Sequence, residues 1–205
     1  MFHSFTRRTF GAAALFAPVG LHGGAAGAAL ATGFIDALHT DGPASDRADK
    51  MGLYAFLVGS WRTELKAYEP NGTMHTSRGE IHAGWVLEGR AIQDVWMTPP
   101  RTERRPDQPP LPVTGSWYGT TLRIYDASID AWHILWNDPP KAFSSRQIGR
   151  ARGADIVQEG KFDSGALSRW TFTEIQPQSF RWLGEMSADG GDTWRLQIEV
   201  LAQRV

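Results

Sequence analysis

Two charged side chains in one short apolar strand are the first candidates for chemistry. Alternate side chains of a strand point to the same side, so the face with Trp96 also carries Arg90 and Asp94. A carboxylate that faces an apolar interior is costly unless it is paired, and a lone one tends to take up a proton. Asp94 is therefore either one half of a structural ion pair, with a partner such as Arg123, or the polar anchor or general base of a ligand site.

Three further residues could act beside Asp94, depending on which face of their strands points inward. Placing the bulkier apolar side chains inside sends Arg123 and Tyr125 outside, whereas the opposite register offers a guanidinium and a phenol to the interior. His133 alternates with two tryptophans, which indicates a surface or rim position. In an enzyme, Asp94 or His133 would move a proton and Arg123 would stabilise negative charge.

The histidine spacing does not favour a metal site. His75 and His82 are an odd number of positions apart, so in a regular strand they point to opposite faces and cannot share an ion. The chain also has no cysteine, which excludes thiolate ligands and disulfides. We therefore predict no metal and no cofactor.

The elements that must position these residues are short strands of a closed antiparallel sheet. A short apolar run ends at Gly59, and an alternating strand then begins with Trp61 and Leu65 on one face. A large indole just inside the first strand can plug the floor of a barrel. Turn signals follow at intervals of about eight to twelve residues, as expected for a barrel or sandwich.

This pattern predicts an all-β fold, an up-and-down antiparallel β-barrel of about ten strands with a short N-terminal helical plug at residues 49–57. A long proline-rich surface loop is expected at residues 98–116. The strands are expected from residue 61 onward and at 73–85, 91–97, 117–126, 131–137, 142–150, 155–162, 167–175, 180–187 and 193–203. The side chains expected to point inward are Trp61, Thr63, Leu65, Ile81, Ala83, Trp85, Leu122, Ile124, Trp132, Ile134, Trp136, Trp170, Phe172, Phe180, Trp182, Met186, Trp194, Leu196 and Ile198.

The composition favours a small molecule over a polyanion as the partner. The 205 residues carry 21 basic and 22 acidic side chains, so the formal net charge of -1 gives no long-range attraction to nucleic acid or anionic membrane. The nine tryptophans suit either a packed core or a cavity for flat apolar ligands. We expect Trp96, Trp136 and Trp182 to line such a cavity, with Arg90 and Tyr125 as further ligand contacts.

Residues 1–31 are predicted to be an export signal. Arg7 and Arg8 stand in a Thr-Arg-Arg-Thr-Phe run before a Gly- and Ala-rich stretch without acidic residues, which resembles a twin-arginine signal. The twin-arginine export machinery would then be a partner during biogenesis, and the protein would be periplasmic or secreted. Residues 32–50 would form a flexible tether, and residues 51–205 the barrel. If translation starts at Met51 instead, the protein is cytoplasmic.

Several blocks of the sequence resemble a widespread bacterial family of lipocalin-like (calycin) barrels, most of whose members have no assigned function. These blocks are Gly59-Ser60-Trp61, Gly84 to Trp96, Gly119 to Asp126 and Ser187 to Trp194. The resemblance covers residues 56–204 and implies a barrel with an internal cavity. Nitrobindin-type haem barrels also begin near a Gly-x-Trp, but their further glycine is absent here, which puts haem in doubt.

Three functions remain open from the sequence. The first is binding of a small, largely apolar and aromatic molecule inside a Trp-lined barrel. The second is a cofactor-independent lyase, isomerase or cyclase that acts on such a molecule by acid–base catalysis. The third is a structural, envelope-associated barrel whose interior is filled by its own indoles.

Overall fold

The computed structural model describes residues 33–104 and 116–205. The predicted export signal at residues 1–31 lies outside the described residues, as does most of the loop expected at residues 98–116.

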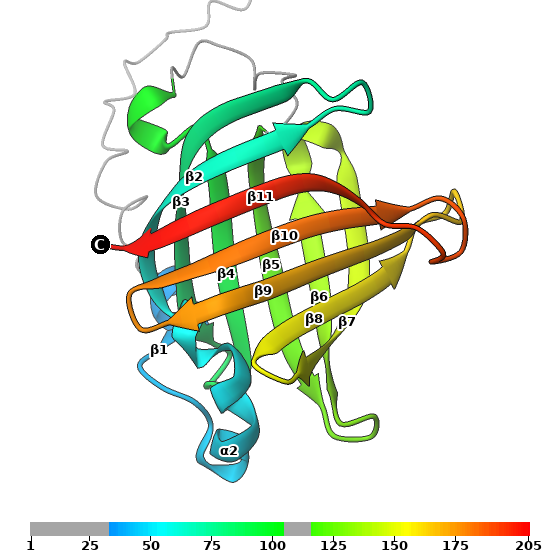
Figure 1. Cartoon of the computed structure of the whole chain (residues 1–205). Helices are drawn as coiled ribbons and strands as arrows, with labels where there is room; N and C mark the ends of the chain where they lie inside the picture. Colours follow the sequence, from blue (N-terminus) through cyan, green and yellow to red (C-terminus); the bar gives the residue numbers. More distant parts are fainter. Residues whose placement is uncertain (1–32, 105–115) are drawn as a thin grey trace, which may run out of the picture.

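In the described part of the chain, ten antiparallel strands form a closed up-and-down barrel (Figure 1). Each strand pairs with the next along the chain, and the last strand pairs with the first, with Ile198 opposite Ala67 and Arg204 opposite Trp61. The predicted fold is thereby confirmed. The strands are β2 (Gly59–Tyr68), β3 (Met74–Val86), β4 (Ala91–Thr98), β5 (Trp117–Asp126), β6 (Ala131–Asp138), β7 (Phe143–Arg152), β8 (Asp155–Lys161), β9 (Leu167–Gln176), β10 (Ser179–Ser187) and β11 (Arg195–Arg204).

The predicted helical plug closes one end of the barrel. It consists of α2 (Ala48–Met51) and the 3-10 helix η2 (Gly52–Leu57), which lie at the lower end of the barrel in Figure 1. Met51, Tyr54 and Leu57 are fully buried, because the apolar side of this segment faces the barrel interior. This end of the barrel is therefore filled with side chains.

The segment before the plug differs from the flexible tether that the composition predicted. Residues 33–38 are helical, and β1 (His39–Thr40) pairs with the end of β3, with Thr40 opposite Trp85. After β1, the Ala44 amide donates to the Gly89 carbonyl, and the 3-10 helix η1 (Ser45–Arg47) follows. The glycines and prolines here shape turns, because the backbone finds partners on β3 and on the turn after it.

Trp61 lies in the filled end, as predicted for a floor residue. Its side chain is fully buried, its Nε1–H donates to the Leu57 carbonyl at 2.8 Å, and its ring meets Phe180 edge-on at 4.8 Å between centroids. The Arg204 guanidinium lies over the indole at 4.1 Å. Trp61 thus ties the plug to β2, β10 and β11 at once.

The inward faces were predicted correctly on most strands and wrongly on β5. On β6 the tryptophans and Ile134 point inward as expected. On β5, however, Thr121 and Arg123 are buried and Leu122 points to the outer wall, where it lies opposite Leu135. Ile124 shares the outward face with Leu122. The assumption that the bulkier apolar set faces inward fails here because the interior holds a polar pair at this level.

The inward face was also predicted wrongly at the start of β11. Gln197 is an extra residue, because Gly184 pairs with Ile198 while Glu185 pairs with Leu196. Leu196 therefore lies on the outer face with Glu185, although it was expected inside. Trp194 precedes the strand and lies outside as well, under the Arg169 guanidinium at 4.1 Å.

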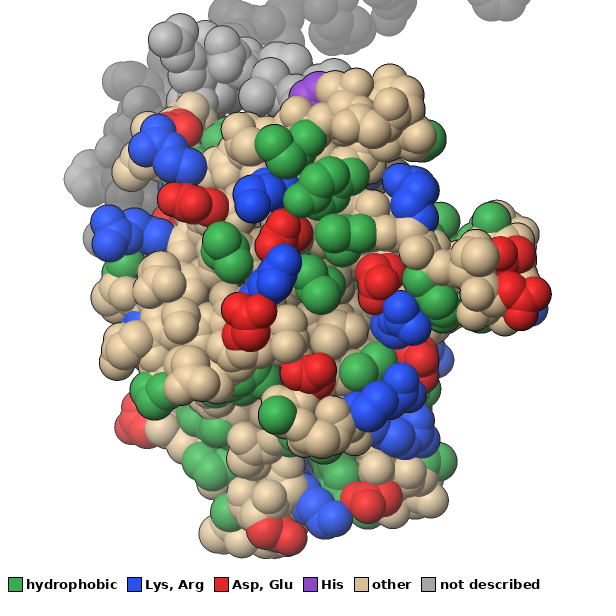
Figure 2. Space-filling model, viewed as in Figure 1, with side chains coloured by type: hydrophobic (Ala, Val, Ile, Leu, Met, Phe, Trp, Pro, Cys, Tyr) green, Lys and Arg blue, Asp and Glu red, His purple; other side chains and the backbone are tan. Residues whose placement is uncertain are grey.

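The outer wall carries no large area of one charge on the side seen in Figure 2, where basic, acidic and apolar side chains are interspersed. Among the described residues, no helix has the length and apolar character needed to cross a membrane.

Candidate ligand-binding cavity

The end of the barrel opposite the plug contains a cavity of about 1190 Å³. Residues from strands β4 to β11 and from the turns after β6 and β8 line this cavity, at the end of the barrel away from α2. Its volume exceeds the roughly 300–1,000 Å³ of ordinary small-molecule pockets. The aromatic residues that line it are Trp96, Trp117, Trp136, Phe143, Phe162, Trp170 and Trp182.

Among the described residues, five tryptophans line this cavity and form a connected cluster. Trp182 lies at its centre, with centroid distances of 5.5 Å to Trp96, 5.6 Å to Trp117 and 5.7 Å to Trp170. Trp117 also meets Trp136 at 6.3 Å. These rings are edge-on or tilted, the arrangements that aromatic side chains prefer, so the cavity has rigid apolar walls.

The predicted ligand contacts Trp96, Trp136 and Trp182 all lie in this cluster. Sequence reasoning missed Trp117 as a site residue. Trp117 shares the parity of Thr121 and Arg123 on β5, so the same register error hid it. The less favoured register of this strand, with Arg123 inward, would have placed Trp117 in the cavity as well.

Asp94 and Arg123 form an ion pair inside the barrel. The Asp94 Oδ2 accepts a hydrogen bond from the Arg123 Nη1, and its Oδ1 accepts one from the Thr121 amide at 3.1 Å. Asp94 is 1% exposed and Arg123 is 2% exposed. Asp94 thus has the arginine partner that the sequence offered as the structural alternative.

Arg123 lines the floor of the cavity. Its guanidinium lies 5.3 Å from the Tyr54 ring centroid and 5.8 Å from that of Phe172. Burial raises the pKa of the Tyr54 phenol well above its usual value, although Arg123 opposes this, so Tyr54 stays neutral. The floor is therefore a cation that is held between a carboxylate and two aromatic faces.

Two residues expected at the site lie elsewhere. Arg90 was expected in the barrel interior, but it is exposed in the turn before β4, where its Nη1 bonds Asp46 at 3.0 Å. The alternation that placed it inside does not hold, because β4 begins only at Ala91. Tyr125 is not among the cavity residues, since its hydroxyl donates to Asp130 at 2.6 Å near the plugged end.

His133 lies on the outer face of β6, half-buried, as its alternation with tryptophans indicated. Its Nε2 is 2.9 Å from the Asp126 Oδ2. Hydrogen bonds from Ser128 and His133 lower the pKa of Asp126 to about 2, although burial opposes this. His133 is consequently separated from the cavity by the barrel wall and is not brought together with Asp94 and Arg123.

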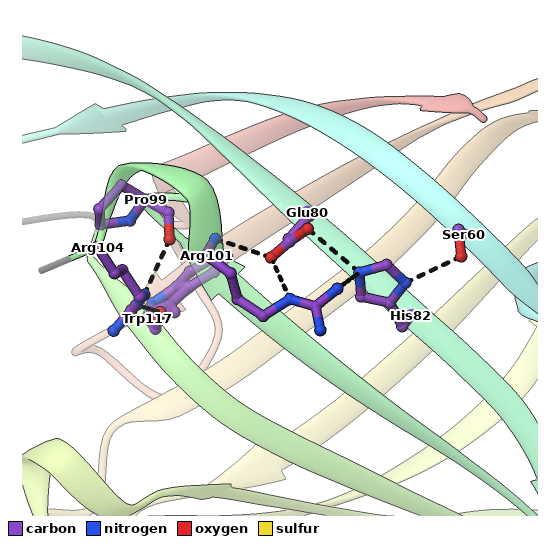
Figure 3. A network of polar contacts seen from close by, with 7 residues as sticks. All are labelled: Ser60, Glu80, His82, Pro99, Arg101, Arg104 and Trp117. Atoms are coloured by element: carbon purple, nitrogen blue, oxygen red, sulfur yellow. Dashed lines mark hydrogen bonds and ion pairs between the residues drawn. The ribbon is translucent and has the colours of Figure 1, made fainter. Parts of the chain in front are cut away.

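Two arginines hold the start of the β4–β5 connection at the mouth of the barrel (Figure 3). Arg104 donates to the carbonyls of Pro99, at 3.0 Å, and Trp117, at 2.8 Å, so it bridges the segments that follow β4 and begin β5. Arg101, in the 3-10 helix η3 (Arg101–Glu103), bonds Glu80 on β3 through both its backbone amide and its Nε at 2.8 Å. These contacts fix the backbone beside one of the cavity indoles.

Glu80 continues this network along the outer wall. Its Oε2 is 3.2 Å from the His82 Nε2, and the His82 Nδ1 is 2.9 Å from the Ser60 hydroxyl (Figure 3). Burial alone would raise the pKa of Glu80, but hydrogen bonds from the Arg101 side chain and backbone and from His82 outweigh it, so the pKa is lowered. The described residues hold no group of three metal-ligating side chains.

The sequence matches no protein-family model and no curated protein. Among solved structures, the chain is similar to Rv2717c from M. tuberculosis, with a TM-score of 0.51, 12% identity and coverage of 77% of this chain and 98% of that one. It is also similar to an S-type phycobiliprotein lyase, CPES, from Guillardia theta, with a TM-score of 0.51, 11% identity and coverage of 80% and 98%. Identities this low establish the fold alone, and the fold is that of a calycin-like barrel.

Proposed function

We propose that this protein binds a small, largely apolar and aromatic molecule inside the barrel. The observation that carries the proposal is the cavity of about 1190 Å³ with walls of tryptophan indoles and with Arg123 at its floor. Flat ligands gain dispersion and apolar burial from such walls, and one charged group is enough to fix their orientation. We also propose that the chain belongs to the bacterial family of lipocalin-like (calycin) barrels, because its sequence motifs resemble those of that family.

Binding is favoured over acid–base catalysis because no proposed base is free to reach a bound molecule. Both oxygens of Asp94 already accept hydrogen bonds, from the Thr121 amide and Arg123, and Asp94 is not among the residues that line the cavity. His133 lies on the other side of the wall. A general base must come within hydrogen-bond reach of the proton that it removes.

A purely structural barrel is the weaker alternative for a different reason. The plugged end is indeed filled, with Phe180 in contact with both Trp61 and Phe172. The opposite end holds the cavity, and a barrel that needed only stability would gain from filling it, because unfilled volume forfeits packing contacts.

Native mass spectrometry of the protein purified from cells that make it naturally would test the proposal. We expect a stoichiometric non-covalent adduct of small mass, released when the protein is unfolded. A matched preparation of Ser145→Trp, which places an indole in the cavity from β7, should lack the adduct. Gln203→Trp, on the exposed wall, should keep it. Equal adducts on both variants would contradict binding in the cavity.

A further inference from the structure

We propose that the ligand carries a hydrogen-bond acceptor, such as a ketone or carboxylate oxygen, and that this acceptor is seated at the floor of the cavity between Trp96 and Arg123. This inference rests on the proposed binding function and specifies the class of ligand.

Among the residues that line the cavity, two buried donors have no partner. The Nε1–H of Trp96 and the Nε–H of Arg123 find no hydrogen-bond acceptor among the described residues. Trp96 is 6% exposed and Arg123 is 2% exposed. An indole N–H and a guanidinium can only donate, so neither can satisfy the other. Leaving such a group buried and unpaired costs the free energy of removing it from water, which a ligand acceptor would recover.

The two donors belong to one region of the cavity. Both side chains line it, and both lie against the same ring, with Phe172 at 6.4 Å from the Trp96 centroid and at 5.8 Å from the Arg123 guanidinium. Asp94 is the carboxylate paired with Arg123, and its oxygens are engaged by the Thr121 amide and by the Arg123 Nη1. The ion pair therefore fixes the guanidinium and leaves its Nε–H for another partner.

The polarity of the mouth supports this orientation. Asp138, at the end of β6, is 1% exposed, and its Oδ1 has no partner among the described residues. Its Oδ2 lies 3.5 Å from the Lys141 ammonium. Among the residues that line the cavity, the unpaired buried donors thus belong to Trp96 and Arg123, and the unpaired buried acceptor belongs to Asp138 at the mouth. A ligand with its acceptor at the inner end matches both.

The test compares two molecules of nearly the same three-ring shape, fluorene and 9-fluorenone, which differ by one carbonyl. Their dissociation constants are measured by quenching of tryptophan fluorescence and by calorimetry. For the unmodified protein we expect 9-fluorenone to bind at least tenfold more tightly. Trp96→Phe keeps an aromatic ring and removes one donor, so it should reduce this ratio at least threefold. Arg123→Lys keeps a cation beside Asp94 and removes the Nε–H, so it should also reduce the ratio.

The matched control is Trp194→Phe, which removes an indole that lies on the outer face and whose Nε1–H already donates to the Gly191 carbonyl at 3.0 Å. The ratio of the two affinities for Trp194→Phe should equal that of the unmodified protein. Equal affinities of fluorene and 9-fluorenone would overturn the inference and leave the binding function intact. Failure of both molecules to bind would count against the binding function itself.

Discussion

Arg123 and Asp94 sit diagonally across β5 and β4, with Arg123 opposite Ile92 and Asp94 opposite Thr121, and their ion pair points into the barrel. Diagonal neighbours on adjacent strands are within reach of a long side chain. The arginine reaches the cavity floor, and the carboxylate holds it there from the side. Asp94 is therefore a positioning residue, and Arg123 is the charged group that a ligand meets.

Asp94→Asn should lower the free energy of unfolding by about 3 kcal/mol, because it leaves the Arg123 charge buried without its counter-ion. Urea unfolding measures this change. Adding Arg123→Met to the variant should recover part of the loss, since no unpaired charge then remains. A single variant within about 0.5 kcal/mol of the original protein would show that the pair is not a structural requirement.

Trp61→Ala should lower the free energy of unfolding by about 3–5 kcal/mol, as expected for removing a large buried aromatic side chain. The variant loses contacts with Phe180 and Arg204 and the hydrogen bond to Leu57. Tyr118→Ala, at a side chain that is 44% exposed, is the control and should cost far less. A loss below about 1 kcal/mol for Trp61→Ala would mean that the plug does not depend on this indole.

The loss of stability at acid pH, measured as the free energy of unfolding, should depend on Glu80. The pKa of Glu80 is lower in the folded protein than in the unfolded chain, so its contribution is complete above the unfolded value of about 4.3 and is lost as the pH falls through the folded pKa. Glu80→Gln should therefore destabilise the protein at pH 7 and flatten the fall in stability below about pH 4.3.

Denaturant unfolding at a series of pH values measures this effect of Glu80. Glu64→Gln, on the exposed face of β2, is the control and should leave the loss of stability at acid pH nearly unchanged. An identical loss of stability at acid pH in Glu80→Gln and the original protein would refute the role of the Arg101 contact.

Export is a prediction that comes from the sequence alone. Residues 1–31 fused to a reporter should direct it to the periplasm by the twin-arginine route, which carries folded proteins, and Arg7→Lys with Arg8→Lys should retain it in the cytoplasm. Fractionation of cells measures the distribution. Normal delivery of the double variant would remove the twin-arginine assignment, and no delivery of the original fusion would favour a start at Met51.

The strand order was predictable because antiparallel hairpins have local sequence signals, namely turn residues between alternating strands. Asn71-Gly72 and Asp189 to Asp192 mark tight turns, and alternating residues between such turns indicate strands. Each strand then pairs with its sequence neighbour, so the strand order follows from local signals, whereas closure needs the long-range pairing of β11 with β2. The plug was predictable for a similar reason, since its apolar residues recur with helical spacing.

The site was only partly predictable because it departs from simple burial rules. On β5 the apolar Leu122 suggests one inward face, but the buried Arg123 lies on the other. Arg123 faces inward because it pairs with Asp94, which lies on the neighbouring strand β4. On β11 the extra residue Gln197 shifts the alternation, which no composition signal marks. Arg90 was misplaced because a turn residue was counted as part of a strand.

The most direct test of ligand binding in the cavity is a calorimetric titration of 9-fluorenone into the original protein and the Ser145→Trp and Gln203→Trp variants. Ser145 faces the cavity from β7, whereas Gln203 is exposed near the end of β11. We predict one site per chain for the original protein and Gln203→Trp, and at least tenfold weaker binding for Ser145→Trp. Equal binding by all three proteins would place the ligand outside the cavity and contradict the proposed function.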